Sequence, residues 1–217
     1  MIDKNLEGEG NRFPAFNLEE MAEALSENAW YVCDGFVSEP VFLHLRDELK
    51  NLQEQEAFRR AGIGKLADYQ SDASIRGDFI HWVDQIDCSA SMTIYLKQLR
   101  EIQAYINRSL FFGLKDLELH FAFYPEGTFY KRHRDRFRQQ SHRILSVVLY
   151  LNQNWSYQQG GLLNIYPENA NIVSIAPIAS RLVIFLSELE HEVTLSGAPR
   201  YSLTGWFRDA PPGLTFL

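Results

Sequence analysis

Cysteine is scarce in this sequence, because only Cys33 and Cys88 occur among its 217 residues. Two cysteines without regular spacing exclude a disulfide framework and a cysteine-ligated metal site. Long hydrophobic runs are also missing, since no stretch reaches the roughly 18 apolar residues that a membrane span needs. The first residues contain neither a basic start nor an apolar run, so we expect no secretory signal. These absences predict a protein without membrane contact that works in the reducing cytoplasm.

An excess of positive charge is missing as well. The chain has 21 lysine and arginine residues against 28 acidic ones, which gives a formal net charge of -7. We therefore expect no binding to nucleic acid, because neutralising phosphates requires surplus basic residues. Basic side chains nevertheless crowd around residues 131–143. On charge pattern alone, this cluster is either a solvated face or a positive rim that attracts an anionic cosubstrate or an acidic protein.

Aromatic residues are plentiful, with 15 phenylalanines and 10 tyrosines, which favours a β-rich core. Three helical patterns come first, and Asn17, Pro40 and Ser91 are placed to begin them. From residue 117 onward, short strand-like runs separated by glycine and proline replace the helical patterns. The candidate strands are Leu117–Tyr124, Phe129–His133, Ile144–Leu151, Leu162–Tyr166, Ile172–Ile175, Leu182–Leu186, Glu192–Leu195 and Tyr201–Phe207.

The order of these elements predicts an α+β fold that is mainly β. About eight strands in one C-terminal block fit a double-stranded β-helix, or jelly roll, with the N-terminal helices packed on one of its sheets. We expect residues 1–12 to form a flexible tail and residues 13–217 to form a single domain. Within that domain, helical support is expected over residues 13–115 and the jelly-roll core over about residues 116–208.

A histidine and a carboxylate two residues apart, His133 and Asp135, stand at the end of one predicted strand. Residues at this spacing in a strand point to the same face, so both can reach one metal ion. A second histidine, His191, comes after several more strand-like runs, as it would if the chain wound around a barrel and returned. Two imidazoles, one carboxylate and open coordination positions suit Fe(II) that activates O2.

Arg200 begins the last predicted strand and shares one face with Thr204 and Trp206, while Tyr150 lies on another strand. An arginine that faces into a barrel needs an anion, because a buried unpaired guanidinium is very costly. That anion is either the carboxylate of a small ligand, bound by the planar guanidinium, or an acidic side chain of the protein itself.

Residues 59–78 form a long polar stretch that is punctuated by glycine. Such stretches inside a compact domain are often lids or binding loops, and an ordinary surface excursion is the alternative. The length of this stretch favours a macromolecular substrate, because a small substrate needs less covering.

Further motifs follow in order along roughly residues 25–208. They are Ser71-Asp72, Arg76-Gly77-Asp78, Trp82, Tyr124-Pro125, Gly127-Thr128, Tyr130, Arg132-His133, Asp135, Arg143, Tyr150-Leu151-Asn152, Trp155, Gly160-Gly161, Ile165, Pro167-Glu168, Arg181-Leu182, His191-Glu192-Val193, Arg200-Tyr201, Thr204 and Trp206. The ordered set resembles the 2-oxoglutarate- and Fe(II)-dependent prolyl hydroxylases. It is most similar to those that hydroxylate hypoxia-inducible factor and to their bacterial relatives.

The resemblance implies a set of cofactors and an iron site. Fe(II), 2-oxoglutarate as cosubstrate and O2 would be required, and ascorbate would support the activity. His133, Asp135 and His191 would be the catalytic residues that bind the iron.

The cosubstrate site follows from the same resemblance. Arg200 and Tyr150 would hold the distal carboxylate of 2-oxoglutarate, with Thr204 near it. Tyr124 would lie beside the cosubstrate near the metal.

For the substrate, the resemblance implies contacts from Arg76 and Asp78, which belong to the segment that closes over a protein substrate in this family. Arg143 and Trp206 would contribute to the same substrate site.

The resemblance thus implies a dioxygenase that hydroxylates a prolyl residue of a protein, with succinate and CO2 as coproducts. A transcription or translation factor is a plausible substrate, and we expect the enzyme to be a monomer. Two alternatives stay open: an oxygenase of a free amino acid or other small molecule, and a non-catalytic sensor module that binds metal or 2-oxoglutarate.

Overall fold

The structure is a computed structural model, and the tail predicted for residues 1–12 lies outside the residues that it describes. Much of the predicted loop of residues 59–78 also lies outside them. The described residues are 16–62, 72, 74–136, 142–168 and 170–210.

Three helices precede most of the strands: α1 (Leu18–Asn28), α2 (Glu39–Glu54) and α3 (Ala90–Leu110). As predicted, Asn17 caps α1, because its side-chain oxygen accepts hydrogen bonds from two backbone N–H groups at 3.0 and 3.3 Å.

The N-cap predicted for the third helix was wrong by two residues. Ser89 caps α3 and accepts a hydrogen bond from the Met92 N–H at 3.1 Å, whereas Ser91 lies buried inside the first turn. Both serines precede the same apolar pattern, and the hydrogen-bonding distance to the third helical N–H selects the earlier one.

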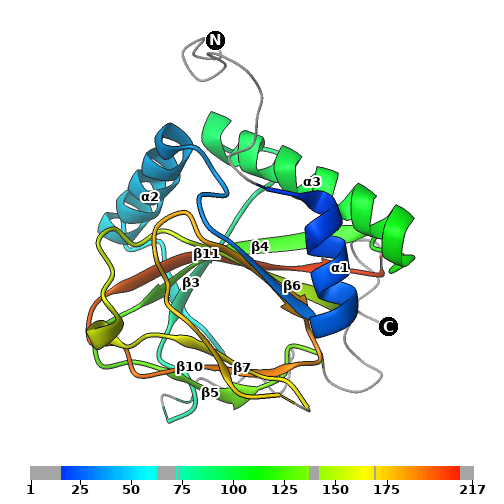
Figure 1. The fold of residues 1–217 in the computed structure, drawn as a ribbon. Helices are drawn as coiled ribbons and strands as arrows, with labels where there is room; N and C mark the ends of the chain where they lie inside the picture. Colours follow the sequence, from blue (N-terminus) through cyan, green and yellow to red (C-terminus); the bar gives the residue numbers. More distant parts are fainter. Residues whose placement is uncertain (1–15, 63–71, 73, 137–141, 169, 211–217) are drawn as a thin grey trace.

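Two antiparallel sheets form the core of the fold (Figure 1). The major sheet has seven strands in the order β1-β9-β6-β11-β4-β3-β2, and the minor sheet has four in the order β5-β10-β7-β8. The major-sheet strands are β1 (Trp30–Cys33), β2 (Arg59–Arg60), β3 (Phe79–Trp82), β4 (Asp116–Tyr124), β6 (Arg143–Tyr150), β9 (Leu182–Leu186) and β11 (Arg200–Arg208). The minor-sheet strands are β5 (Tyr130–His133), β7 (Leu163–Tyr166), β8 (Val173–Ile175) and β10 (Glu190–Val193).

The predicted fold class is confirmed. The three helices cover one face of the major sheet, and the minor sheet lies on its other side (Figure 1). All eight predicted C-terminal strands are present, with ends displaced by no more than two residues. The short strand β2 was missed, because two exposed residues are too few to show an alternating pattern.

Alternation along the central strands divides the interior into two layers. On β6, Leu149 belongs to the large cluster packed against the helices, whereas its neighbours Val148 and Tyr150 belong to the cluster on the opposite side of the sheet. Successive strand residues point to opposite faces, so every second residue of β4, β6 and β11 faces the minor sheet. Side chains on this inner face are therefore the ones available for a site between the sheets.

None of the helices in the described part of the chain is both long and apolar enough to cross a membrane.

Gly205 lets β11 pack closely against β4. A Cβ atom at this position would lie 2.1 Å from the Glu118 carbonyl oxygen and 2.5 Å from a Leu119 methyl carbon. Because a backbone carbonyl cannot rotate away, we predict that Gly205→Ala lowers the free energy of unfolding by about 3 kcal/mol in denaturant titrations.

Gly113→Ala is the matched control. A Cβ atom there meets nothing within 4 Å, and only the positive φ of 65° opposes it. This substitution should cost about 1 kcal/mol. Equal losses in the two variants would show that close packing at Gly205 is not what constrains β11.

Candidate active site

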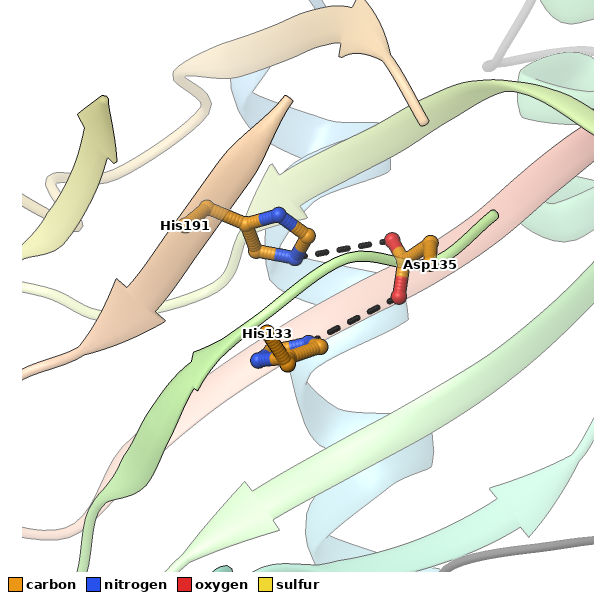
Figure 2. Close-up of side chains that lie close together, drawn as sticks. All are labelled: His133, Asp135 and His191. Carbon is orange, nitrogen blue, oxygen red and sulfur yellow. Dashed lines mark ion pairs between the residues drawn. The ribbon is translucent and has the colours of Figure 1, made fainter. Parts of the chain in front are cut away.

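Two histidines and one aspartate meet between the sheets (Figure 2). His133 ends β5, Asp135 lies in the turn that follows it, and His191 lies on β10. The strands are neighbours, and His133 and His191 are directly paired in register. Nε2 of His133 lies 3.6 Å from Asp135 Oδ1, and Nε2 of His191 lies 3.5 Å from Asp135 Oδ2. The structure thus brings together the three residues that the sequence singled out.

Backbone carbonyls fix the orientation of both imidazole rings. Nδ1 of His133 lies 2.7 Å from the Lys131 carbonyl oxygen, and Nδ1 of His191 lies 2.9 Å from the Leu189 carbonyl oxygen. A carbonyl only accepts, so Nδ1 carries a proton in each ring and Nε2 is the nitrogen that faces Asp135. This arrangement is typical of histidines that bind a metal through Nε2.

Asp135 is prepared to be an anionic ligand. The Ser146 hydroxyl donates a hydrogen bond to its Oδ2 at 2.6 Å, and the Ser187 hydroxyl lies 2.9 Å from that of Ser146. Burial acts to raise the pKa of Asp135, but its interactions with His191, His133 and Arg143 outweigh burial, so the pKa lies well below its usual value. The carboxylate is therefore ionised at neutral pH.

The ligand set fits a metal ion. The three ligand atoms lie within 4.8 Å of one another, and burial lowers the pKa of His191 to about 4, which keeps its imidazole neutral. Two imidazoles and one carboxylate on one side of a metal ion leave coordination positions free, as non-haem Fe(II) oxygenases require.

Arg200 lies deeper between the sheets and is only 2% exposed. Its Nε donates to the Gly161 carbonyl oxygen at 3.0 Å, and its guanidinium carbon lies 4.9 and 5.0 Å from the ring centroids of Tyr124 and Tyr150. Among the described residues, no ion pair includes Arg200. The alternative in which an acidic side chain neutralises this arginine is thus not found in the described part of the chain.

The hydroxyl of Tyr150 is buried and has no hydrogen-bond partner among the described residues. Burial raises the pKa of Tyr150, and the nearby charge of Arg200 opposes that rise. A buried cation beside a neutral hydroxyl donor is suited to a ligand carboxylate. These two residues therefore fit the distal carboxylate of a dicarboxylic cosubstrate.

Comparison with known proteins agrees with this geometry. Residues 119–208 match the family model of the 2OG-Fe(II) oxygenase superfamily. The chain is 32% identical over 205 residues to prolyl hydroxylase EGLN3 of Mus musculus, covering 89% of this chain and 84% of that protein. The chain belongs to the prolyl hydroxylase family of 2-oxoglutarate- and Fe(II)-dependent oxygenases.

Solved structures agree with this membership. A Pseudomonas putida prolyl-4-hydroxylase is 36% identical, with a TM-score of 0.81 and coverage of 89% of this chain and 99% of that one. A Trichoplax adhaerens prolyl hydroxylase, solved with a peptide fragment of the hypoxia-inducible-factor oxygen degradation domain, is 29% identical, with a TM-score of 0.79 and coverage of 88% and 89%. This oxygenase is therefore an enzyme, and Fe(II), 2-oxoglutarate and O2 are the cofactors of its family.

Thr204 and Tyr124, both predicted to lie near the cosubstrate, face the inner space of this oxygenase. Tyr124 is paired with Arg200 across β4 and β11. The Thr204 hydroxyl lies 3.1 Å from the Ser202 hydroxyl. Both residues follow Arg200 on the same face of β11, and Thr204 is the more distant of the two. Their assignment to the cosubstrate stays a prediction.

Two of the residues predicted to bind substrate are bound to each other. Nε and NH2 of Arg76 donate to the two carboxylate oxygens of Asp78 at 2.7 and 2.6 Å. Asp78 is 1% exposed, and the Arg76 guanidinium also lies 4.2 Å from the Tyr130 ring centroid. In this structure both residues hold the edge of the site in place, and contact with a substrate stays a prediction.

The other two residues predicted for the substrate, Arg143 and Trp206, lie against each other. The guanidinium carbon of Arg143 is 3.3 Å from a ring centroid of Trp206, and its NH2 is 3.5 Å from the Glu118 carboxylate. The positive charge of Arg143 also contributes to the low pKa of Asp135. Arg143 thus packs against the Trp206 ring and also acts on the charge of the metal ligand Asp135.

The basic cluster around residues 131–143 is partly neutralised. Arg132 and Arg134 both form ion pairs with Glu190, and Arg132 also lies over the Tyr166 ring, 4.0 Å from its centroid. These contacts favour a structural role for two of the cluster's arginines.

Three residues of the site were given no role there from the sequence. Tyr130 stacks on His133 with a centroid distance of 3.6 Å, Ser146 supports Asp135, and His120 lies buried on β4. The alternation of side chains along a strand could have identified His120. It lies four residues before Tyr124 on β4, so the two side chains point to the same face of the sheet.

The buried His120 predicts how stability depends on pH. Burial, with smaller effects of Arg76 and Arg143, lowers the pKa of His120 from 6.5 to about 3. Between these values only the unfolded protein binds the proton, so unfolding is favoured as the pH falls. We predict that the unfolding free energy of the metal-free protein decreases from near neutral pH towards pH 4, and decreases less in His120→Phe.

Denaturant titrations at several pH values measure this difference. His44→Phe, which replaces an exposed histidine on α2, is the control and should keep the wild-type dependence. If His120→Phe has the same pH dependence as the wild type, His120 is not buried in its neutral form.

Proposed function

We propose that this oxygenase hydroxylates a prolyl residue of a protein substrate. The observation that carries the proposal is the pairing of an open three-ligand metal site with a buried arginine, in a protein related to prolyl hydroxylases. The Trichoplax relative is described in complex with a peptide, which supports a polypeptide as the substrate. In this proposal residues 13–217 act as one oxygenase domain.

In this proposal His133, Asp135 and His191 hold Fe(II). Bound Fe(II), with 2-oxoglutarate and O2, supplies the oxidising chemistry: the cosubstrate loses CO2 and becomes succinate with one oxygen atom, and the other oxygen atom enters the substrate. The protein's own contribution is geometric. The carbonyls of Lys131 and Leu189 keep both Nε2 atoms directed at the metal position.

Arg200 and Tyr150 bind the distal carboxylate of 2-oxoglutarate and so set its orientation. A guanidinium offers two parallel donors, and the low dielectric between the sheets strengthens the ion pair. We assign Tyr124 and Thr204 to the walls beside the cosubstrate, because both face the space between Arg200 and the metal ligands. The substrate approaches the side where Arg143 and Trp206 form the wall.

A cytoplasmic location is part of the proposal. Both cysteines, Cys33 and Cys88, are free thiols, as expected in a reducing compartment. The monomeric state and the supporting role of ascorbate stay predictions from the sequence.

Mass spectrometry of peptide products tests the proposed reaction. A library of synthetic peptides, each with a single proline, is incubated with the enzyme, Fe(II), 2-oxoglutarate, ascorbate and air. We expect some peptides to gain one oxygen atom at proline in step with succinate formation, and none to do so with Asp135→Ala. Oxidation of free amino acids alone, without any peptide product, would overturn the proposal.

Arg200→Lys tests the cosubstrate site. A lysine keeps the charge but offers a single point contact in place of two parallel donors. We predict that the concentration of 2-oxoglutarate at half-maximal turnover rises by about tenfold, corresponding to about 1.4 kcal/mol of lost binding. Succinate formation at varied 2-oxoglutarate concentration measures this change.

Arg208→Lys is the control on the same strand. Arg208 forms ion pairs with Asp116 and Glu118 at the far end of β11, away from Arg200. The same substitution there should leave the 2-oxoglutarate requirement at the wild-type value. An unchanged requirement in Arg200→Lys would remove Arg200 from the cosubstrate site.

A further inference from the structure

His120 occupies an unusual place in the wall of the site. It lies on β4, is 3% exposed, and is paired in register with Trp82 of β3 and Thr204 of β11. Its ring centroid lies 5.1 Å from that of Trp82 and 5.2 Å from that of Trp206. An imidazole is therefore held between two indole rings on the inner face of the major sheet.

Two polar atoms of this aromatic group have no hydrogen-bond partner in the described part of the chain. They are Nδ1 of His120 and Nε1 of Trp206, and both are buried. Most buried polar atoms in proteins are hydrogen-bonded, because leaving one unpaired costs free energy. Two such atoms on adjacent rings indicate that a polar group from outside this wall forms hydrogen bonds with them.

One ring of this group is open to solvent, and another lies against Arg143. Trp82 is 51% exposed, and the guanidinium carbon of Arg143 lies 3.3 Å from a ring centroid of Trp206. The charges of Arg143 and Asp135 both act on the His120 ring. A substrate that contacts Arg143 and Trp206, as in the proposed function, would also lie beside these rings.

The two side chains that carry the unpaired atoms are both neutral at neutral pH. Burial holds the pKa of His120 at about 3, so its imidazole is uncharged at neutral pH and offers one donor and one acceptor. The indole N–H of Trp206 can only donate. A neutral pair of this kind matches the carbonyl and N–H groups of a peptide backbone, whereas a carboxylate would be drawn to Arg200.

We propose that His120 positions the polypeptide substrate by hydrogen bonding through Nδ1 to a backbone peptide group beside the target residue, with the Trp206 N–H donating to a neighbouring carbonyl. The proposal rests on the proposed function, because it requires a polypeptide substrate. Packing against the two indole rings fixes the orientation of the imidazole, so little side-chain freedom is lost when the substrate binds.

Two substitutions separate hydrogen bonding from packing. His120→Phe keeps a ring between Trp82 and Trp206 but removes the nitrogen atoms. His120→Asn loses the ring but keeps a polar atom near the position of Nδ1. A hydrogen-bonding role and a packing role therefore predict opposite orders for the two variants.

Peptide kinetics provide the first measurement, with the library peptide that the wild type hydroxylates fastest as the probe. We expect His120→Phe to raise the peptide KM about three- to tenfold, which matches the loss of one hydrogen bond, with a smaller effect on kcat. His120→Asn should restore much of the wild-type KM. If His120→Phe keeps the wild-type KM, or His120→Asn is the more impaired variant, the proposal is overturned.

Unfolding of the substrate-free protein provides the second measurement. Because Nδ1 is unpaired there, His120→Phe should be at least as stable as the wild type at neutral pH. A clear loss of stability would assign His120 a structural role and overturn the proposal without reference to any substrate. If the wild type hydroxylates no peptide, the proposed function fails along with this inference, whereas an active wild type with unaffected variants contradicts the inference alone.

Discussion

The site depends on one constraint, which is that a carboxylate and two imidazoles must share a small space between two sheets. Asp135 comes from a turn, so its position is not fixed by strand pairing. It is fixed instead by the Ser146 hydroxyl, which extends from β6 in the opposite sheet. Without such a contact, a buried ionised carboxylate would gain solvation by turning towards water. The hydrogen bond therefore couples the metal ligands to the major sheet.

A second constraint is the buried charge of Arg200. The protein satisfies it only in part, with one carbonyl oxygen and the faces of two tyrosine rings. A fold that leaves a guanidinium in this state sacrifices stability for binding, as functional sites commonly do. The same pattern appears at His120 and Trp206, where buried polar atoms lack partners in the described part of the structure. All three residues lie on the inner face of the major sheet, which is consequently the face that receives ligands.

Much of this arrangement could be predicted from the sequence, and the reason is periodicity. Strand alternation paired His133 with Asp135 and placed Arg200 on an inward face, while the order of the strands pointed to His191 and to the jelly roll. The details that escaped prediction depend on the pairing of distant strands. The sequence contains Ser146 but does not say which carboxylate it meets, because that follows from how β6 faces the turn after β5. Likewise, Arg76 and Asp78 are two residues apart, yet only the structure reveals that they bind each other.

The two sheets supply different residues of the site, and this has a mechanical consequence. The imidazoles belong to the minor sheet, whereas Arg200, Tyr124 and Tyr150 belong to the major one. In the proposed function, a dicarboxylate bound at both the metal and the guanidinium would connect the two sheets. Its binding would then oppose their separation, and the protein without cosubstrate would be the form whose sheets separate most easily.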